Sequence, residues 1–266
     1  MKKLFAIALA LMLVLSCFAG CGDKEGDAET KTVVVGYTLY APMNYMEGDE
    51  LVGFDTDLAK AVFEGLGYEV VFQEIDWEAK YTDLEAGTID CIWNGFTCNT
   101  ADDDGVMRSE KVDFSYNYME NRQVIVVKSD SAVTSAADLS GKMGSVESGS
   151  AGETYANSFE GASVKGATKQ TDCLMEVNSG AADFAVLDAQ LAKSYVGKGD
   201  YANLKIVEEL SSDVEYYAIG FKKGSELTAQ VNEQLVKLAE DGTIAKIAEK
   251  YDVVNTTITD YSDQQK

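Results

Sequence analysis

The side chains that most often carry enzyme chemistry are scarce in this sequence of 266 residues. It contains no histidine, which excludes Ser-His-Asp and Cys-His catalytic groups and HExxH zinc sites. Cys91, Cys98 and Cys173 match neither a zinc-site spacing nor a disulfide framework. We expect buried free thiols, with a Cys91–Cys98 disulfide as the alternative. The sequence therefore predicts no catalytic residue, no metal site and no cofactor.

Two short motifs could hold a phosphate or a metal ion, but neither is complete. Gly144 and Gly149 have the spacing of a phosphate-binding loop, yet Ser150 and Ala151 stand where that loop requires Lys-Ser or Lys-Thr. The acidic run 102–104 lacks the ligand spacing of a calcium loop. We therefore exclude nucleotide binding and interpret the acidic run as a solvated surface loop.

Alternating strands and helices must position the functional side chains, a pattern typical of α/β proteins. The first series has strands predicted at 33–36, 70–72 and 89–95 and helices predicted at 55–66 and 81–85. An extended run at 122–128 leads to a second series, with strands predicted at 143–146, 184–187 and 214–221 and helices predicted from 153, at 172–179, around 231–240 and at 243–251. Two α/β units joined by two extended runs predict two lobes, with a ligand cleft between them.

The charge of the chain excludes one large class of partners. It has 22 basic and 45 acidic residues, a formal net charge of −23. Such a field repels phosphate backbones, so we expect no nucleic-acid binding. It also repels anionic lipid surfaces.

The N-terminus has the features of an export signal in their usual order. Lys2 and Lys3 precede an apolar run at 4–15 that is too short to span a bilayer. The segment Phe-Ala-Gly-Cys ending at Cys21 resembles a bacterial lipobox, with Cys17 as a poorer candidate and an ordinary secretory signal as the alternative. We therefore expect a signal peptide at 1–20, a lipid-anchored flexible spacer at 21–31, and an extracytoplasmic protein tethered to the cell membrane through Cys21.

Five segments, in order, resemble the solute-binding proteins of polar amino acid ABC importers, which form bacterial solute-binding protein family 3. The resemblance runs from about Val33 to Asp252 and is carried by 51–59 (LVGFDTDLA), 87–97 (GTIDCIWNGFT), 108–115 (RSEKVDFS), 180–188 (GAADFAVLD) and 240–243 (EDGT). It implies a two-lobed periplasmic-binding-protein-like fold with a double-strand hinge and an interlobe ligand cleft. The expected division is lobe 1 at 32–123 and 218–260, lobe 2 at 124–217 and a tail at 261–266.

The resemblance also implies a site for the two charges of a free amino acid. Arg108 matches the carboxylate-binding arginine of the family, since a guanidinium can form two parallel hydrogen bonds to a carboxylate. The loop before it is longer than usual, and a surface arginine is the alternative. Asp188 matches the ammonium-binding aspartate, with helix N-capping as a second role. Thr97 should offer its hydroxyl and Gly95 its carbonyl to the ammonium, with helix-face burial as the competing explanation of Thr97.

Further matching positions are expected to enclose the ligand. Ser150 and Ala151 belong to the turn before the helix predicted from 153, where backbone N–H groups and the helix dipole favour a carboxylate. Tyr40 and Trp77 match aromatic residues on opposite walls, and burial in the core is the alternative for both.

Asn94 and Glu147 align with positions that touch the ligand side chain, and a carboxylate at 147 favours a donor or a positive charge there. The resemblance implies a monomer that is not an enzyme. It would capture a polar or cationic amino acid, or cystine, by closing its lobes, and deliver it to an ABC permease. The alternatives are a ligand-sensing module for a membrane receptor and a dehydratase-like enzyme on the same fold.

Overall fold

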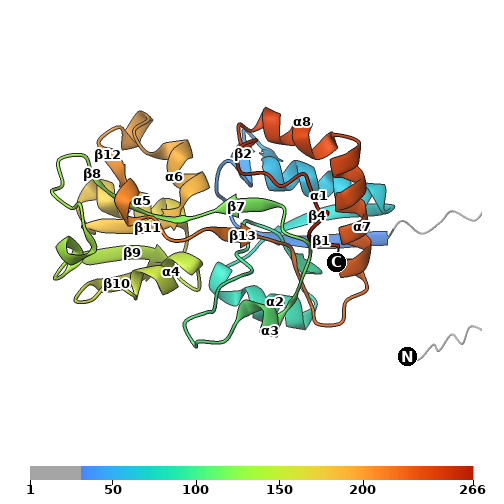
Figure 1. Cartoon of the computed structure of the whole chain (residues 1–266), viewed down its shortest axis with the longest axis horizontal. Coiled ribbons are helices and arrows are strands. Elements are labelled where there is room, and N and C mark those ends of the chain that lie inside the picture. Colours follow the sequence, from blue (N-terminus) through green and yellow to red (C-terminus); the bar gives the residue numbers. More distant parts are fainter. Residues whose placement is uncertain (1–30, 266) are drawn as a thin grey trace, which may run out of the picture.

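Two β-sheets stand at opposite ends of the molecule, joined by two strands that cross between them (Figure 1). The computed structural model describes residues 31–265. The expected signal peptide, the lipidation of Cys21 and the spacer up to residue 30 lie outside the described residues.

The first sheet has five strands, in the spatial order β4 (Tyr68–Glu74), β1 (Lys31–Tyr37), β5 (Cys91–Ile92), β14 (Gly220–Phe221) and β6 (Asp113–Phe114). β1 runs parallel to both β4 and β5, whereas β14 runs antiparallel to β5 and β6. β14 follows all strands of the second sheet in the sequence, so the first sheet combines strands from before and after the second one.

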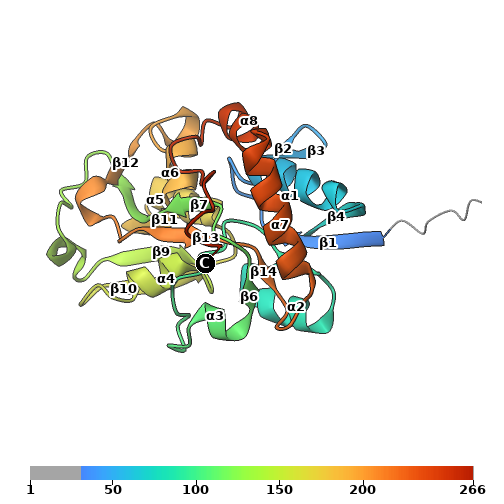
Figure 2. The same cartoon turned by 45° about the vertical axis from the view of Figure 1, so that its right-hand side comes forward.

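The second sheet also has five strands, in the order β10 (Ser163–Ala167), β9 (Met143–Glu147), β11 (Phe184–Asp188), β8 (Gln123–Lys128) and β12 (Leu204–Val207). β7 (Met119–Asn121) and β13 (Glu215–Tyr217) pair antiparallel between the sheets, with Asn121 opposite Glu215. These two strands carry the chain from one sheet to the other and back, as Figure 2 also shows. The predicted pair of α/β units with a double crossover is confirmed.

Helices cover the faces of both sheets. The first lobe contains α1 (Phe54–Gly65), α2 (Lys80–Ala86), α3 (Arg108–Lys111), α7 (Leu227–Glu240) and α8 (Thr243–Lys250), together with a hairpin of β2 (Tyr45–Glu47) and β3 (Glu50–Val52). The second lobe contains α4 (Ala151–Ala156), α5 (Gln170–Ser179) and α6 (Ala189–Tyr195). Short 3-10 turns lie at Trp77–Ala79, Ala136–Leu139, Gly199–Tyr201 and Glu208–Leu210.

Some predicted boundaries were wrong for local physical reasons. The strand predicted at 89–95 is reduced to β5, because the chain turns at Gly95, whose φ of 57° lies in the left-handed region. The strand predicted at 214–221 is divided into β13 and β14, which belong to different sheets. β10 and β12 were not predicted; β10, for example, is a half-exposed edge strand without a clear apolar face.

The described residues contain neither a disulfide bond nor a membrane-spanning helix. Cys91, Cys98 and Cys173 are free thiols, so the alternative of a Cys91–Cys98 disulfide is wrong. Cys98 is only half-buried, unlike the other two. Within residues 31–265 no helix has the length and apolar character needed to cross a bilayer.

An aromatic cluster fixes the loop that follows β5. Trp93 is fully buried, with its ring centroid 5.9 Å from that of Phe63 and 6.1 Å from that of Tyr118. Asp55, in the first turn of α1, accepts hydrogen bonds at Oδ2 from the Gly95 N–H (2.9 Å) and the Tyr118 hydroxyl (3.0 Å). Buried aromatic packing and hydrogen bonds to Asp55 therefore fix the position of this loop.

Burial of Asp55 makes the stability of the fold depend on pH. Its side chain is fully buried, and burial raises its pKa from 3.8 to about 7. The folded protein thus keeps a proton that the unfolded chain loses above pH 4, so this contribution to stability is lost as pH rises from about 4 to 7. We expect urea denaturation to give a free energy of unfolding that falls over this range, by up to about 4 kcal/mol from Asp55 alone.

The matched variant Asp55→Asn isolates this effect, because asparagine keeps an acceptor for Gly95 and Tyr118 but does not titrate. The difference in unfolding free energy between the two proteins should change from pH 5 to pH 8. Parallel pH profiles in both proteins would contradict the role given to Asp55.

Candidate functional site

A pocket between the two lobes gathers most of the residues that the sequence suggested. Its lining comes from both sides of the crossing strands, and every lining side chain is buried. The lining residues are Trp77, Asn94, Gly95, Thr97 and Arg108 from the first lobe and Glu147, Ser150, Ala151, Gln170 and Asp188 from the second. Nine of the ten suggested residues are in this set, and Gln170 was not suggested. The tenth, Tyr40, is buried in the hydrophobic core, as its alternative predicted, with its hydroxyl beside Gly95.

Arg108 is held in the pocket by hydrogen bonds at all three guanidinium nitrogens. Nε donates to Asp102 Oδ1 (2.7 Å), Nη1 to the Thr97 carbonyl (3.2 Å) and Nη2 to the Gly149 carbonyl of the other lobe (3.2 Å). The guanidinium also lies 5.2 Å from the centre of the Phe96 ring. The side chain is 1% exposed, so the alternative of a surface arginine is wrong.

Asp102 belongs to the acidic run that was interpreted as a solvated loop, and for this residue the interpretation was wrong. Its Oδ2 accepts from the Tyr81 hydroxyl (2.7 Å) and from Lys111 Nζ (2.8 Å), while Oδ1 accepts from Arg108. Burial alone would raise the pKa of Asp102, but the charge of Arg108 and hydrogen bonds from Lys111 and Tyr81 outweigh it and lower the pKa to about 2. The lengthened loop therefore supplies the carboxylate that orients Arg108.

Asp188 lies across the cleft from Arg108, at the end of β11. Its Oδ1 accepts from Asn121 Nδ2 and Gln123 Nε2, both at 2.7 Å, and its Oδ2 accepts from Gln170 Nε2. Although Asp188 precedes α6, its side chain forms no capping hydrogen bond with that helix. Burial raises its pKa despite these donors. The side chain is thus directed into the cleft, not at the helix end.

Two further carboxylates lie close to Asp188. Glu215, on β13, accepts from the same two amides, Asn121 Nδ2 (2.6 Å) and Gln123 Nε2 (2.8 Å), and burial together with the charge of Asp188 raises its pKa to about 7. Glu147, at the end of β9, is 4% exposed, and the same two causes raise its pKa to about 8. Sequence reasoning missed Glu215 and Gln170. A charged residue inside the β-rich run at 214–221 was the available signal for Glu215.

Trp77 and Tyr40, the two suggested aromatic residues, both belong to the first lobe and are closely packed there. Trp77 packs edge-on against Phe96, with centroids 5.4 Å apart. The Tyr40 hydroxyl lies 3.2 Å from that of Tyr217. A Cβ on Gly95 would lie 2.2 Å from the Tyr40 oxygen, so only glycine fits at that position.

Asn94 and Thr97 are the neutral polar residues that the first lobe contributes to the pocket. Asn94 donates to the Thr38 carbonyl (2.8 Å) and Asn44 Oδ1 (2.7 Å), so its amide is bound within the first lobe. Thr97 belongs to no helix, which makes helix-face burial the wrong explanation of its position. It forms an isolated bridge with Tyr217 instead.

Most polar groups of the turn before α4 are hydrogen-bonded within the second lobe. Gly149 N–H donates to Glu153 Oε2 (2.7 Å), and Ser150 N–H donates to the Glu147 carbonyl (3.2 Å). Ser150 Oγ accepts from Glu153 N–H (3.1 Å) as the N-cap of α4. The N–H groups of Ala151 and Gly152, the first two helical positions, have no intrahelical acceptor and are the remaining donors here.

Direct contacts join the two lobes across the cleft. Lys80 is 2% exposed, and its Nζ donates to the Gly149 carbonyl (2.9 Å) and to the Trp77 carbonyl (3.2 Å). Burial and the nearby charge of Arg108 lower the pKa of Lys80 to about 7. At the rim, Lys169 Nζ lies 2.5 Å from Glu74 Oε1. The lobes are therefore closed on each other at the pocket.

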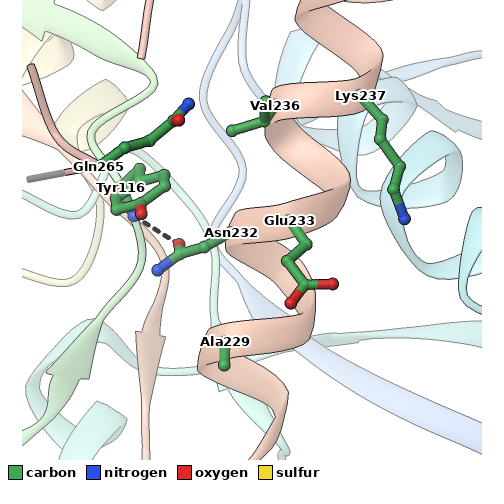
Figure 3. Close-up of a pocket in the computed structure, with 7 residues that line it drawn as sticks. All are labelled: Tyr116, Ala229, Asn232, Glu233, Val236, Lys237 and Gln265. Atoms are coloured by element: carbon green, nitrogen blue, oxygen red, sulfur yellow. Dashed lines mark hydrogen bonds between the residues drawn. The ribbon is translucent and has the colours of Figure 1, made fainter. Parts of the chain in front are cut away.

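A second, wider groove lies on the outer surface of the first lobe, along α7 (Figure 3). Its side chains offer one carboxylate, on Glu233, and one ammonium, on Lys237. Asn232 Oδ1 accepts from the Tyr116 N–H (2.7 Å) at its edge. Because it draws on one lobe and has few convergent polar groups, it is the weaker candidate. Residues 31–265 contain no group of three or more acidic or cysteine side chains arranged to hold a metal.

Proteins of a known family resemble this chain over most of its length. The sequence profile described as bacterial extracellular solute-binding proteins, family 3, matches residues 33–253. The chain belongs to this family. The family resemblance and the two-lobed periplasmic-binding-protein-like fold expected from the sequence are thereby confirmed.

Relatives in this family match nearly the full chain. The arginine-binding extracellular protein ArtP of Bacillus subtilis (strain 168) is 30% identical over 257 residues, covering 94% of this chain and 98% of ArtP. The solved structure of an ancestral arginine-binding protein bound to arginine is 34% identical with a TM-score of 0.75, covering 83% of this chain and 97% of that one. The ancestral amino acid-binding protein AncCDT-1, a precursor of cyclohexadienyl dehydratase, is 31% identical with a TM-score of 0.73, covering 83% and 95%.

Proposed function

We propose that this protein captures a free amino acid between its lobes and delivers it to an ABC importer. The observation that carries this proposal is the pair Arg108 and Asp188, buried, opposite in charge and contributed by opposite lobes to one pocket. A zwitterionic amino acid needs a cation for its carboxylate and an anion for its ammonium. Family relatives that bind arginine support the same ligand class.

Each residue of the pocket then has a proposed contact. The ligand carboxylate binds the Nη atoms of Arg108 and the N–H of Ala151, in place of the Gly149 carbonyl that Arg108 now contacts. The ammonium binds Asp188, the Thr97 hydroxyl and the Gly95 carbonyl. The aliphatic part of the ligand packs against the wall formed by Trp77, Asn94 and Ser150, and Tyr40 supports this wall from behind Gly95.

Closure of the lobes is the proposed mechanism of capture. The moving parts are residues 32–123 with 218–260 and residues 124–217, and they rotate about β7 and β13. A ligand that touches both lobes favours the closed state through the contacts it makes only there. The closed monomer then docks on a membrane permease, near which lipid on Cys21 keeps it at the outer face of the membrane.

Titration calorimetry tests the proposal directly. The full-length protein in mild detergent is titrated with each of the twenty amino acids, with ornithine and with cystine. We expect a saturable heat with at least one of them. The absence of any binding heat or thermal shift across this set would overturn the amino-acid assignment.

An enzymatic role is the second candidate, because one solved relative is a precursor of a dehydratase. Buried carboxyl groups such as Glu147 have the chemistry of general acids and bases. Incubation with each amino acid that binds, followed by mass spectrometry, distinguishes the two roles. Unchanged ligand supports capture, and a product formed with turnover supports catalysis.

Asp102 offers a further prediction about the same site. Replacing it by asparagine should weaken amino-acid binding about 5- to 20-fold, because Arg108 loses the charged partner that fixes its orientation. Asp104→Asn is the matched control, since Asp104 lies in the same loop and also pairs with Lys111 but is 56% exposed. Equal losses of affinity in both variants, measured by calorimetry, would contradict a positioning role for Asp102.

A further inference from the structure

Glu147 is a buried carboxyl group that forms no ion pair with any described side chain. It lines the pocket at the end of β9, and hydrogen bonding from Gln170 is its stabilising polar contact. The salt bridges among residues 31–265 do not include it. Lys80 exerts a favourable charge on it from a distance, but its Nζ donates to the carbonyls of Trp77 and Gly149. A carboxylate in this position costs free energy unless a cation joins it.

The charges around the pocket favour a ligand that carries an extra positive charge. Arg108 and Lys80 are the cations, and Arg108 is already paired with Asp102. Opposite them are three buried carboxyl groups, on Glu147, Asp188 and Glu215. An amino acid with a neutral side chain brings one cation, its ammonium, which Asp188 receives, and Glu147 keeps its proton. A second cation on the ligand stabilises the ionised form of Glu147.

We propose that Glu147 selects amino acids whose side chain carries a positive charge, the class of arginine, lysine and ornithine. This inference rests on the proposed function, and it adds a specificity-determining residue to the pair that holds the backbone of the ligand. The side-chain cation lies between the Glu147 carboxylate and the ring of Trp77, which lines the pocket from the opposite lobe. Lys80 Nζ already lies 5.1 Å from the centre of this ring, so the ring is placed to attract cations in the pocket.

Proton release accompanies this selection. The pKa of Glu147 is raised to about 8 by burial and by the charge of Asp188, so near pH 7 the carboxyl group holds a proton. A ligand cation stabilises the carboxylate and displaces that proton. Affinity for a cationic amino acid therefore rises with pH below 8, by up to about tenfold per pH unit. Asp188, Lys80 and Asp76 are the other charged groups that act on Glu147.

Arginine and citrulline provide the matched pair of ligands, because citrulline has nearly the same shape with an uncharged end group. We expect the full-length protein to bind arginine at least about 30-fold more tightly than citrulline at pH 8, as for a desolvated charge pair. This ratio should shrink as pH falls to 6, and calorimetry in buffers of different ionisation enthalpy should detect more protons released with arginine than with citrulline.

Glu147→Gln should reduce the arginine-to-citrulline affinity ratio about 30-fold. Glu249→Gln, on the exposed side of α8, has the same charge change and should leave the ratio unaltered. If the variant does not fold, the ligand pair and the pH series still decide the question in the unaltered protein. Citrulline or glutamine bound as tightly as arginine would overturn the role of Glu147 and leave the proposed function intact. If the unaltered protein bound no amino acid at all, the proposed function would instead be overturned.

Discussion

Replacing Arg108 by lysine is expected to weaken binding of every accepted amino acid by at least about 30-fold. Lysine keeps the positive charge but cannot form two parallel hydrogen bonds to a carboxylate. It also leaves Asp102, Thr97 and Gly149 without the donors that they now have at 2.7, 3.2 and 3.2 Å. The loss should appear equally with cationic and neutral amino acids, because the ligand carboxylate is common to both.

Arg122→Lys is the matched control for this experiment. Arg122 is exposed on the protein surface, and its Nη1 donates to the Ser212 carbonyl (2.6 Å), a contact that lysine can replace. Calorimetric affinities of the control should match the unaltered protein. Near-normal affinity in Arg108→Lys would move the carboxylate contact elsewhere in the cleft.

Replacing Asp188 by asparagine is expected to reduce affinity by about 30-fold or more without destabilising the fold. The ligand ammonium loses its anionic partner, and the new amide group faces donors from Asn121, Gln123 and Gln170. The variant also removes a buried carboxyl group whose pKa is raised in the folded state, which favours folding above pH 4. These effects on stability oppose each other, so the unfolding temperature should change little.

Asp200→Asn, on the exposed surface of the second lobe, is the control for the loss of one negative charge. Thermal unfolding is followed in parallel with calorimetry. If Asp188→Asn lost affinity only in proportion to a large drop in unfolding temperature, the residue would have a structural role and not an ammonium-binding one.

The sequence predicted the lobed fold because its strongest signals are local. Apolar spacing along α1 and α7 and the runs of apolar residues in β8 and β11 identified the main elements of both units. Edge strands such as β10 gave no such signal, since half-exposed strands need not alternate. The extent of β5 depended on a left-handed turn at Gly95, which tertiary contacts with Tyr40 fix.

Resemblance to family motifs identified most pocket residues but not the side chains that hydrogen-bond to them. Arg108 and Asp188 came from matching segments, whereas Asp102, Gln170 and Glu215 did not, because their roles depend on contacts formed only in the folded chain. Asp102 in particular looked like part of a solvated acidic loop. Nothing local distinguishes it from Asp103 and Asp104, which are exposed.

The carbonyl of Gly149 accepts hydrogen bonds from Lys80 and Arg108, so one oxygen of the second lobe joins two cations of the first. In the proposed transport cycle the ligand carboxylate replaces the bond to Arg108, whereas the bond to Lys80 remains. The ligand and Lys80 then hold the lobes together, so a stronger Lys80 bond favours the closed state and slows release of the ligand. Delivery to the permease therefore depends on how readily this single bond opens.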